Sequence, residues 1–194
     1  MNATVKWVLI GVGVAVLTGF VIGFAQSAIG ADFGLLTPLA ATFAGVLTGY
    51  IGLNLSGNRK TETVSNWDKG VALALEPATG QALLVIYREG FVGSMAGMNI
   101  SINEREVAQL RSPQFTVVPL SAGAHHLQAA FGGLAGPQNN PSKLTVQAAP
   151  GQVLAVRAVI GMGLIKNTIR LEPDASDLPV LRQRLAGMRM IAPA

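Results

Sequence analysis

The sequence has no cysteine and little charge, and each deficit narrows the class of protein that it encodes. Without cysteine there are no disulfides, thiolate metal sites, cysteine nucleophiles or lipid-carrying cysteines. Charged residues make up 12% of the chain, against roughly 25% in an average soluble protein. Half of the residues are hydrophobic, and the 194 residues have room for one ordinary domain plus an appendage. Part of the chain is therefore expected to avoid water.

The shortage of charged residues is greatest near the N-terminus. Residues 1–57 contain only Lys6 and Asp32 as charged groups. The net charge of +4 belongs to the remainder of the chain, whose basic residues are scattered, with Arg59 and Lys60 as the one adjacent pair. A solvated surface explains this scatter better than a phosphate-binding stripe, so we expect no nucleic-acid partner.

Two uncharged apolar segments predict a transmembrane hairpin over residues 1–57, with helices at 7–29 and 35–55. The first segment starts with WVLIGVGVAVLTGFVIGFA, which as a helix is long enough to cross ~30 Å of hydrocarbon. The polar break between the segments is short, so both helices return to the same side of the lipid bilayer. A second interpretation makes the first segment a signal peptide, with Ala25, Ser27 and Ala28 near the cleavage site.

Small residues recur at every fourth position in both segments. They are Gly11, Ala15, Gly19, Gly23, Ala41, Gly45 and Gly49. Each set lies on one helix face and allows the close backbone approach that favours helix association in lipid. The general abundance of glycine in membrane helices accounts for one or two such residues, but poorly for two matched periods. We expect a helix-packing interface, either within one hairpin or between hairpins.

Basic residues flank the two segments unequally. Lys6 precedes the first, and Arg59, Lys60 and Lys69 follow the second, whereas the connecting loop carries only Asp32. By the positive-inside rule, both termini and the domain that follows are cytoplasmic at a bacterial inner membrane. A periplasmic location of that domain is the alternative.

Beyond the hairpin, residues 58–70 resemble a polar juxtamembrane linker, in which Trp67 is an interfacial anchor or, preferably, a core residue of the next domain. Residues 71–173 predict a mainly-β sandwich of about seven to eight antiparallel strands. The expected strands are 82–88, 98–103, 106–110, 115–119, 125–131, 143–148, 153–160 and 165–172. The first and seventh are apolar at nearly every position, which predicts central places or cover by another element.

Residues 174–194 predict a C-terminal amphipathic helix and a tail. Asp174 and Asp177 are candidate caps, and Pro179 suits a first turn. Helical spacing puts four apolar residues on one face, namely Leu178, Leu181, Leu185 and Met188. We expect this face to pack on the sandwich and three arginines to remain in water, namely Arg182, Arg184 and Arg189. The alternative places these arginines against anionic lipid head groups.

Several strand and turn segments, in order, read LLVIYRE, FVGS, MNISINEREVAQL, FTVVPLSAGAHHLQA and KLTVQAAPGQVLAVRA. Over residues 80–172 they resemble a bacterial family of small sandwich domains, the domain of unknown function 2846 type, and more distantly the PEGA-type surface domains. The resemblance implies a fold and an exposed surface, and brings no catalytic residue. Members of the family often follow a lipoprotein signal, whereas this chain has no cysteine and has a helical hairpin instead.

No pattern of residues points to catalysis. His125 and His126 are adjacent in a predicted strand, so their side chains point to opposite faces and do not share one metal. One of them is expected to brace the turn at 121–124 by hydrogen bonding. The carboxylates are dispersed, the glycine-rich turns lack a phosphate-binding context, and no base is placed to activate Ser94 or Ser121. We therefore expect no enzyme activity, no metal and no cofactor.

Two classes of function remain. The leading hypothesis is a non-catalytic membrane protein that forms a homo-oligomer or is an accessory subunit of another membrane protein complex. The alternative is a membrane-anchored module that senses a small ligand, a lipid or an envelope component through its sandwich loops. Loops carry binding residues disproportionately, and the candidates are 91–97 and 132–141.

Overall fold

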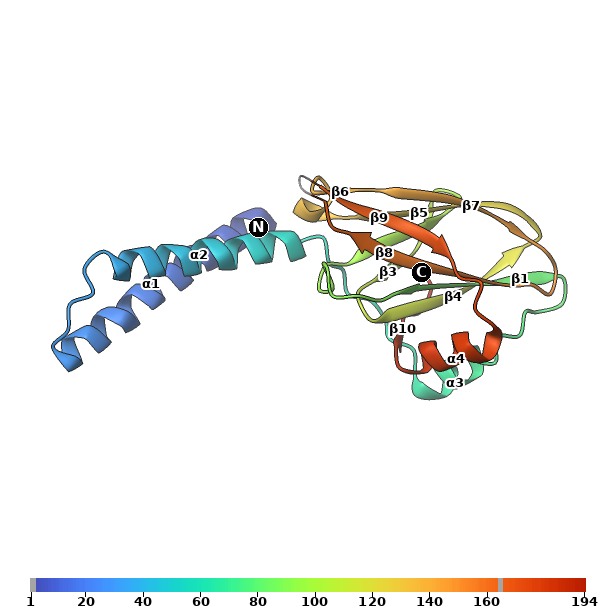
Figure 1. Ribbon diagram of the computed structural model, residues 1–194, viewed down its shortest axis with the longest axis horizontal. Coiled ribbons are helices and arrows are strands. Elements are labelled where there is room, and N and C mark those ends of the chain that lie inside the picture. The colour runs from blue at the N-terminus through green and yellow to red at the C-terminus, as the bar shows by residue number, and fades with distance from the viewer. Residues whose placement is uncertain (1–2, 164–165) are drawn as a thin grey trace. The chain divides into compact units, whose positions relative to one another are not determined.

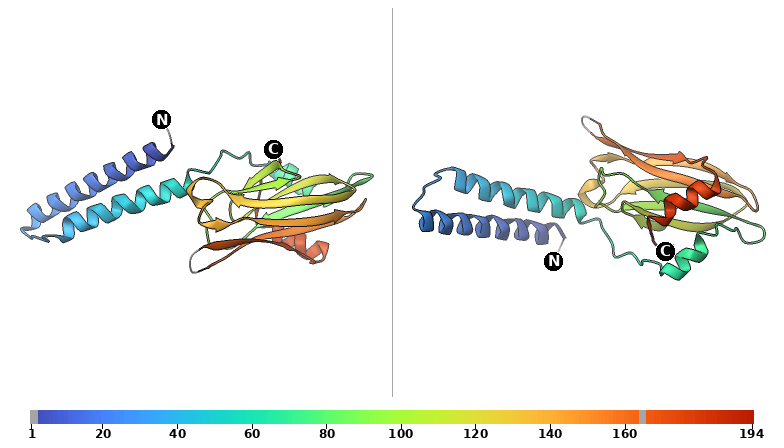
Figure 2. Two further views of the ribbon diagram at one scale, coloured as in Figure 1. Left: turned by 90° about the horizontal axis from the view of Figure 1, so that it is seen from above. Right: turned by 60° about the horizontal axis from the view of Figure 1, so that its bottom comes forward.

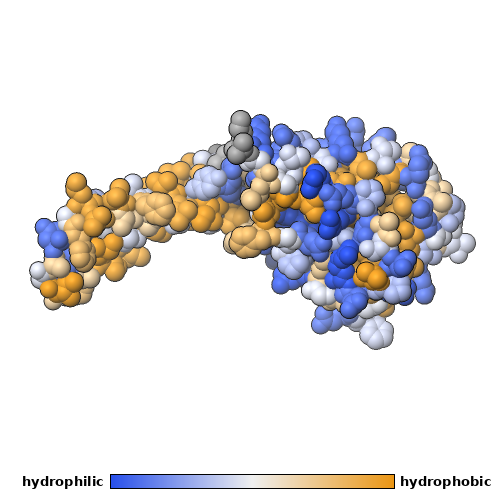
Figure 3. Space-filling model, in the orientation of Figure 1, coloured by the Kyte–Doolittle hydropathy of each residue, from blue (hydrophilic) through white to orange (hydrophobic). Residues whose placement is uncertain are grey.

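A computed structural model describes residues 3–163 and 166–194, which form two compact units, Met1–Ser56 and Gly57–Ala194. The first unit consists of the helices α1 (Ala3–Ile29) and α2 (Leu36–Leu55), which lie side by side (Figure 1). Both helices are long and apolar enough to cross a membrane. Large apolar side chains such as Phe20, Phe24 and Phe43 point outward, and hydrophobic residues cover both helices in Figure 3.

The turn between the two helices is stabilised by local hydrogen bonds. Gly30 and Gly34 both have positive φ, a conformation that glycine adopts without a steric penalty. The Asp32 carboxylate accepts a hydrogen bond of 2.8 Å from the backbone N–H of Gly34, and Gln26 donates one of 2.8 Å to the Thr37 hydroxyl. The polar break in the sequence therefore forms a compact connection.

The second unit contains two sheets that face each other (Figure 2). The larger sheet has the order β10 (Arg189–Met190), β4 (Gln114–Ser121), β1 (Gln81–Arg88), β8 (Val153–Gly161), β9 (Asn167–Pro173) and β6 (Asn139–Asn140). The smaller has the order β3 (Arg105–Leu110), β2 (Met98–Ile102), β5 (Gly123–Phe131) and β7 (Ser142–Ala148). The eight strands expected from the sequence are all present, although residue 165, where the last was expected to begin, lies outside the described residues. The strands β6 and β10 were not predicted, because two residues leave no alternation to detect.

The prediction of a purely antiparallel sandwich was wrong. The smaller sheet is antiparallel, but in the larger sheet β1 pairs in parallel with β8, β10 with β4, and β6 with β9. Alternation along a strand indicates which face is buried, and it does not indicate the neighbour or its direction. The nearly continuous apolar character of β1 and β8 is typical of strands buried on both faces, and both occupy central positions, as predicted.

The core has two layers, one on each face of the larger sheet. Between the sheets lie residues such as Leu84, Ile86, Ile100 and Leu127. On the other face a second cluster covers β1 and β4, and its members are Leu75, Val85, Tyr87, Phe115, Val117, Leu181, Leu185, Met188 and Met190. The helices α3 (Asn66–Ala72) and α4 (Leu178–Ala186) lie on this face in Figure 1.

The helix α3 was not predicted from the sequence, and it corrects the assignment of Trp67 to a core. Ser65 caps the helix by accepting a hydrogen bond of 3.1 Å from the Asp68 N–H. The helix has only seven residues and packs on the second cluster through Ala72 and the following Leu73. Trp67 lies on the opposite face and is 81% exposed.

The C-terminal helix buries most of its predicted face. Leu181, Leu185 and Met188 are buried in the second cluster, whereas Leu178, at the first position of α4, is 40% exposed. Pro179 is in the first turn as predicted. Asp177 occupies the N-cap position without a side-chain hydrogen bond to the helix.

Candidate functional site

The predicted small-residue faces meet in the first unit at Gly11 and Gly45. A Cβ atom added to Gly45 would lie 2.6 Å from the Gly11 carbonyl oxygen and 2.7 Å from the Ala15 Cβ. One added to Gly11 would lie 2.7 Å from the Gly45 carbonyl oxygen. The two backbones are therefore in direct contact, and neither position has room for a side chain.

The other predicted positions contribute unequally to this helix contact. A Cβ on Gly19 would be 3.6 Å from the Ala41 Cβ, and one on Gly49 would be 3.7 Å from the Trp7 carbonyl oxygen. Gly23 has no atom within 4 Å of its Cβ position. The sequence left open whether the small residues pack within one hairpin or between hairpins. The contacts described here are within one hairpin.

Gly52 is a further residue of this interface that sequence reasoning missed. The Trp7 indole occupies the space where a Gly52 side chain would project. Gly52 follows Gly49 by three residues and so falls outside the four-residue period. Residues three apart lie on the same helix face as residues four apart. A search that allowed both spacings would have identified Gly52.

In the second unit, a polar cluster on the outer face of the larger sheet joins three elements. The Asp174 carboxylate accepts hydrogen bonds of 2.6 Å from the Tyr87 hydroxyl and 2.6 Å from the Arg184 guanidinium. Asp174 also accepts a hydrogen bond from the Ser176 hydroxyl, so it closes its own turn and does not cap α4. Arg184, expected in water, instead connects α4 to the sheet, because the carboxylate is within reach at the end of β9.

The environment of this cluster shifts two pKa values in opposite directions. Burial, together with the neighbouring Asp174 carboxylate, raises the pKa of Tyr87 to about 12. Burial alone would raise the pKa of Asp174, but hydrogen bonds from Ser176 and Tyr87 and the Arg184 charge outweigh it and lower that pKa to about 2. At neutral pH the tyrosine is therefore protonated and the aspartate ionised, which suits a structural ion pair and not proton transfer.

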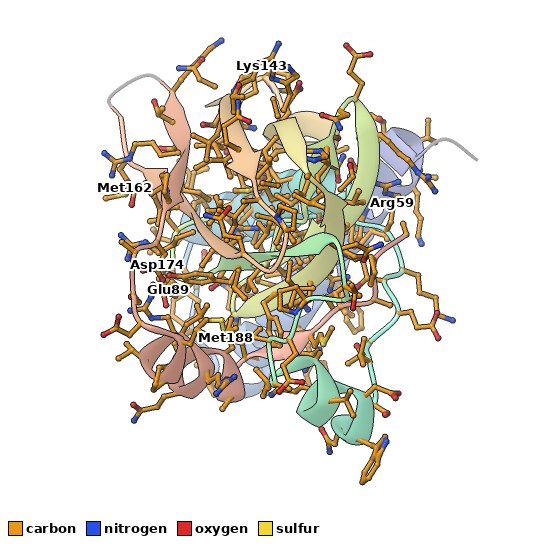
Figure 4. The ribbon with its side chains drawn as sticks, turned by 90° about the vertical axis from the view of Figure 1, so that its right-hand side faces the viewer. Arg59, Glu89, Lys143, Met162, Asp174 and Met188 are labelled. Carbon is orange, nitrogen blue, oxygen red and sulfur yellow. The ribbon has the colours of Figure 1, made fainter. Side chains whose placement is uncertain are left out.

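A second ion-pair group continues across the same sheet face. Arg157 on β8 contacts Glu172 on β9 at 2.9 Å and Glu89 at 3.3 Å. Arg170 contacts Glu172 at 3.3 Å. In Figure 4, Glu89 and Asp174 both lie on the side of the sandwich that carries α4. The two arginines of this group are therefore paired with its two glutamates.

The two histidines point to opposite faces of β5, as predicted. The buried His125 donates from Nε2 to the Ser121 carbonyl at 2.9 Å, which confirms the expected brace across the 121–124 turn. Its Nδ1 accepts from the Asn103 amide at 3.0 Å, and the amide orientation is set because Asn103 Oδ1 accepts from the His126 N–H. Both ring nitrogens of His125 are therefore committed to hydrogen bonds within the fold.

The exposed His126 lies in a shallow depression over β5 and β7. Its Nδ1 is 3.0 Å from the Thr145 hydroxyl. Glu104 and Lys143 line the same depression, whose volume is about 660 Å³. Together these side chains offer hydrogen-bond donors and acceptors and charges of both signs. In the part of the chain that the structure describes, no three His, Cys, Asp or Glu residues are grouped to hold a metal ion.

A buried arginine that the sequence analysis did not single out organises the loop after β1. Arg88 is 1% exposed, and its guanidinium donates to the carbonyls of Gly93, Ala96 and Leu110 at 2.5, 2.5 and 2.9 Å. The Phe131 ring lies 5.0 Å from the same guanidinium. Burial lowers the pKa of Arg88 to about 10, so it remains a cation at neutral pH. A single arginine in a predicted strand is typical of a surface position. The sequence therefore gave no indication that Arg88 is buried and binds the carbonyls of this loop.

The scan against protein-family models finds no match for this chain, and the comparison with curated proteins finds no significant relative.

Proposed function

We propose that this chain is a non-catalytic membrane protein whose helical hairpin anchors a sandwich domain that binds other proteins. The proposal includes two further parts. Residues 80–172 resemble small bacterial sandwich domains without catalytic residues, and the protein is located at a bacterial inner membrane with the sandwich on the cytoplasmic side. The protein then acts as a homo-oligomer or as an accessory subunit of a larger membrane complex.

The observation that carries this proposal is the direct backbone contact at Gly11 and Gly45 between two helices whose outer surfaces are apolar. In water, such outer surfaces would be costly to leave exposed, at about 25 cal/mol for each Å². In lipid that cost vanishes, and close packing of small residues becomes the main source of helix association. A hairpin built in this way is a suitable anchor for a separate domain.

The arrangement of polar groups in the sandwich also favours a non-catalytic role. Asp174, Tyr87 and Arg184 bond to one another, and His125 is engaged by Asn103 and Ser121. Such groups hold elements together, whereas the perturbed acids and bases of an active site usually face an open cleft.

The first experiment is to extract the full chain from its own membrane in mild detergent through a C-terminal tag and to determine the native mass and subunit content. We expect either multiples of the chain alone or stoichiometric foreign subunits. A lone monomer would contradict the proposal.

Glycine variants then separate contacts inside the hairpin from contacts with partners. Gly13 and Gly23 have no atom within 4 Å of their Cβ positions, so a leucine at either is tolerated within the hairpin. If the complex assembles through these surfaces, Gly13→Leu or Gly23→Leu dissociates it, while the monomer stays folded. Gly45→Leu is the matched variant that disrupts the hairpin itself.

A second candidate function is a membrane-anchored sensing module, and the depression with His126, Thr145, Glu104 and Lys143 specifically favours it. Its mixed charges suit a small polar or zwitterionic ligand. A thermal-shift screen of the full chain in detergent with polar metabolites tests this function. A ligand that stabilises the wild type but not the variants His126→Ala and Lys143→Ala would support it, and the absence of any shift would oppose it.

A further inference from the structure

Several loops gather at one end of the sandwich. The parallel neighbours β1 and β8 both finish there, and Met98, at the start of β2, pairs with Phe131, at the end of β5. Ser112 donates a hydrogen bond of 3.1 Å to the Ser94 carbonyl, which joins two of the loops directly. We call this end the entry end and define it as residues 89–97, 111–113, 132–138 and 162–163.

The chain enters the sandwich at this end. A Cβ on Gly57 would lie 2.5 Å from the Gly132 carbonyl carbon, so the two backbones touch. The Asn58 side chain donates to the Met95 carbonyl at 2.9 Å and accepts from the Gly97 N–H at 2.5 Å. Gln109 adds hydrogen bonds to the Gly57 carbonyl and the Arg59 N–H. The first residues after the hairpin unit are therefore fixed to the entry end.

Covalent geometry alone then limits how far the entry end can be from the hairpin. Leu55 is the last residue of α2, and Ser56 is the single residue between it and Gly57. Two residues span at most about 7 Å even when fully extended. If α2 crosses a bilayer, as proposed above, the entry end is held at the surface of that bilayer.

The entry end exposes large apolar side chains. Phe91 is 92% exposed, Met162 is 80% exposed and Met95 is 65% exposed. Met162 points away from the sandwich in Figure 4. One exposed apolar residue is ordinary on a protein surface, but several at one end of a domain mark an interaction surface.

The loop that carries Phe91 and Met95 is held in place. The buried Arg88 guanidinium binds the Gly93 and Ala96 carbonyls of this loop, and Asn58 binds the carbonyl of Met95. Gly93 has positive φ, and a Cβ there would lie 3.2 Å from the Ile160 Cδ1 atom, so the loop packs closely on β8. These contacts hold the loop backbone from Gly93 to Gly97, while the Phe91 side chain that precedes them is exposed to solvent.

The charge around these apolar side chains is suited to anionic lipid. Arg111 lies within the entry end, and the backbone of the exposed Lys166 lies against Gly163 of the same end. Glu89 is the one carboxylate in the sequence of the entry end, and it pairs with Arg157. Basic side chains next to apolar ones attract the anionic head groups while the apolar groups enter the interface.

From these observations we infer that the entry end docks on the same bilayer that the hairpin crosses, with Phe91, Met95 and Met162 in the head-group region. The inference rests on the proposed membrane hairpin. It gives the sandwich one preferred orientation, with the turn at residues 121–124 facing away from the membrane.

Site-directed fluorescence quenching of the full chain in nanodiscs of phosphatidylcholine and phosphatidylglycerol tests this orientation. The chain has no native cysteine, so single thiols can be placed without further changes. An environment-sensitive probe is attached in the variants Met95→Cys and Met162→Cys. Ala122→Cys, at the opposite end of the sandwich, is the aqueous control, and Phe20→Cys, on α1, is the control within the lipid.

Docking predicts that nitroxide-labelled lipids quench the Met95→Cys and Met162→Cys probes several-fold more than the Ala122→Cys probe, and that aqueous iodide does the reverse. Adding Phe91→Ser should reduce lipid quenching at Met162→Cys. If the entry-end probes behave like Ala122→Cys while Phe20→Cys is quenched by lipid, the docking is wrong and the membrane hairpin stands. If Phe20→Cys is not quenched either, both proposals are wrong.

Discussion

At the scale of single residues, Asp174 stabilises the sandwich electrostatically. Its carboxylate follows β9 and bonds to Tyr87 on β1 and to Arg184 on α4. Its pKa of about 2 in the folded protein is below the ordinary value of 3.8. The stabilisation that it contributes is therefore fully present above about pH 4 and is lost as the pH falls towards 2.

Replacing this carboxylate tests its contribution directly. We expect Asp174→Asn to lower the free energy of unfolding at neutral pH by about 1–2 kcal/mol, with the difference from wild type shrinking as the pH falls from 4 to 2. Thermal unfolding of the full chain in detergent, followed by circular dichroism across this pH range, measures the effect. The control is Asp177→Asn, whose side chain makes no cap hydrogen bond. A difference that persists unchanged at pH 2 would contradict this account.

Thr116 gives a prediction of the opposite sign. In the described part of the chain its buried hydroxyl has no hydrogen-bond partner, although the residue is fully buried on β4. Thr116→Val keeps the shape and removes the unpaired group, so we expect the free energy of unfolding to rise by about 1 kcal/mol. Urea unfolding measures the change, with the exposed Thr168→Val as control. A destabilised Thr116→Val variant would indicate that the hydroxyl has a partner.

At the scale of elements, the contact between α1 and α2 depends on the absence of a side chain at Gly45. Gly45→Leu forces the two backbones apart, and we expect the Trp7 indole to lose its packing against Gly52. Trp7 fluorescence, measured in a background with the exposed Trp67 replaced by Phe, should shift and become more accessible to quenchers. Gly13→Leu, which meets no atom within 4 Å, should leave the emission unchanged. Equal spectra for both variants would contradict the packing.

The loop after β1 depends on Arg88 in a similar way. Arg88→Met fills much of the same space but leaves the carbonyls of Gly93, Ala96 and Leu110 without their donor. Each buried unsatisfied group costs about 1–3 kcal/mol, so we expect strong destabilisation and faster hydrogen exchange across residues 89–97. The matched control is Arg111→Met, at the same end of the sandwich but less buried. Unchanged exchange in the loop would show that Arg88 does not hold it.

The elements also show how far sequence reasoning reached. The β-strands were predictable because alternating and continuous apolar runs report burial on one face or on both. The parallel pairing of β1 with β8 was not, since it depends on which distant strand lies alongside. Arg88 and Trp67 were missed for a related reason. Residue type predicts only an average environment. Arg88 is buried because the tertiary fold brings three carbonyls to its guanidinium, and Trp67 is exposed because it lies on the outer face of α3.

At the scale of the whole molecule, the arrangement of charge along the chain predicts how the hairpin would be oriented if it crosses a bilayer. Residues 1–57 carry Lys6 before the first helix and Asp32 in the connecting loop, and the basic residues resume at Arg59. Positive charge is retained on the cytoplasmic side during insertion. If α1 and α2 both cross, this rule predicts that the loop is outside and the sandwich inside.

Thiol labelling distinguishes this orientation from its reverse. Phe33→Cys lies in the connecting loop, and Ala122→Cys lies in an exposed turn of the sandwich. In intact spheroplasts, a membrane-impermeant maleimide should label Phe33→Cys and should label Ala122→Cys only after the membrane is opened. The reverse pattern would put the sandwich in the periplasm. Labelling of both thiols in intact spheroplasts would mean that only one helix crosses, because a crossing hairpin separates the loop from the sandwich by the full thickness of the bilayer.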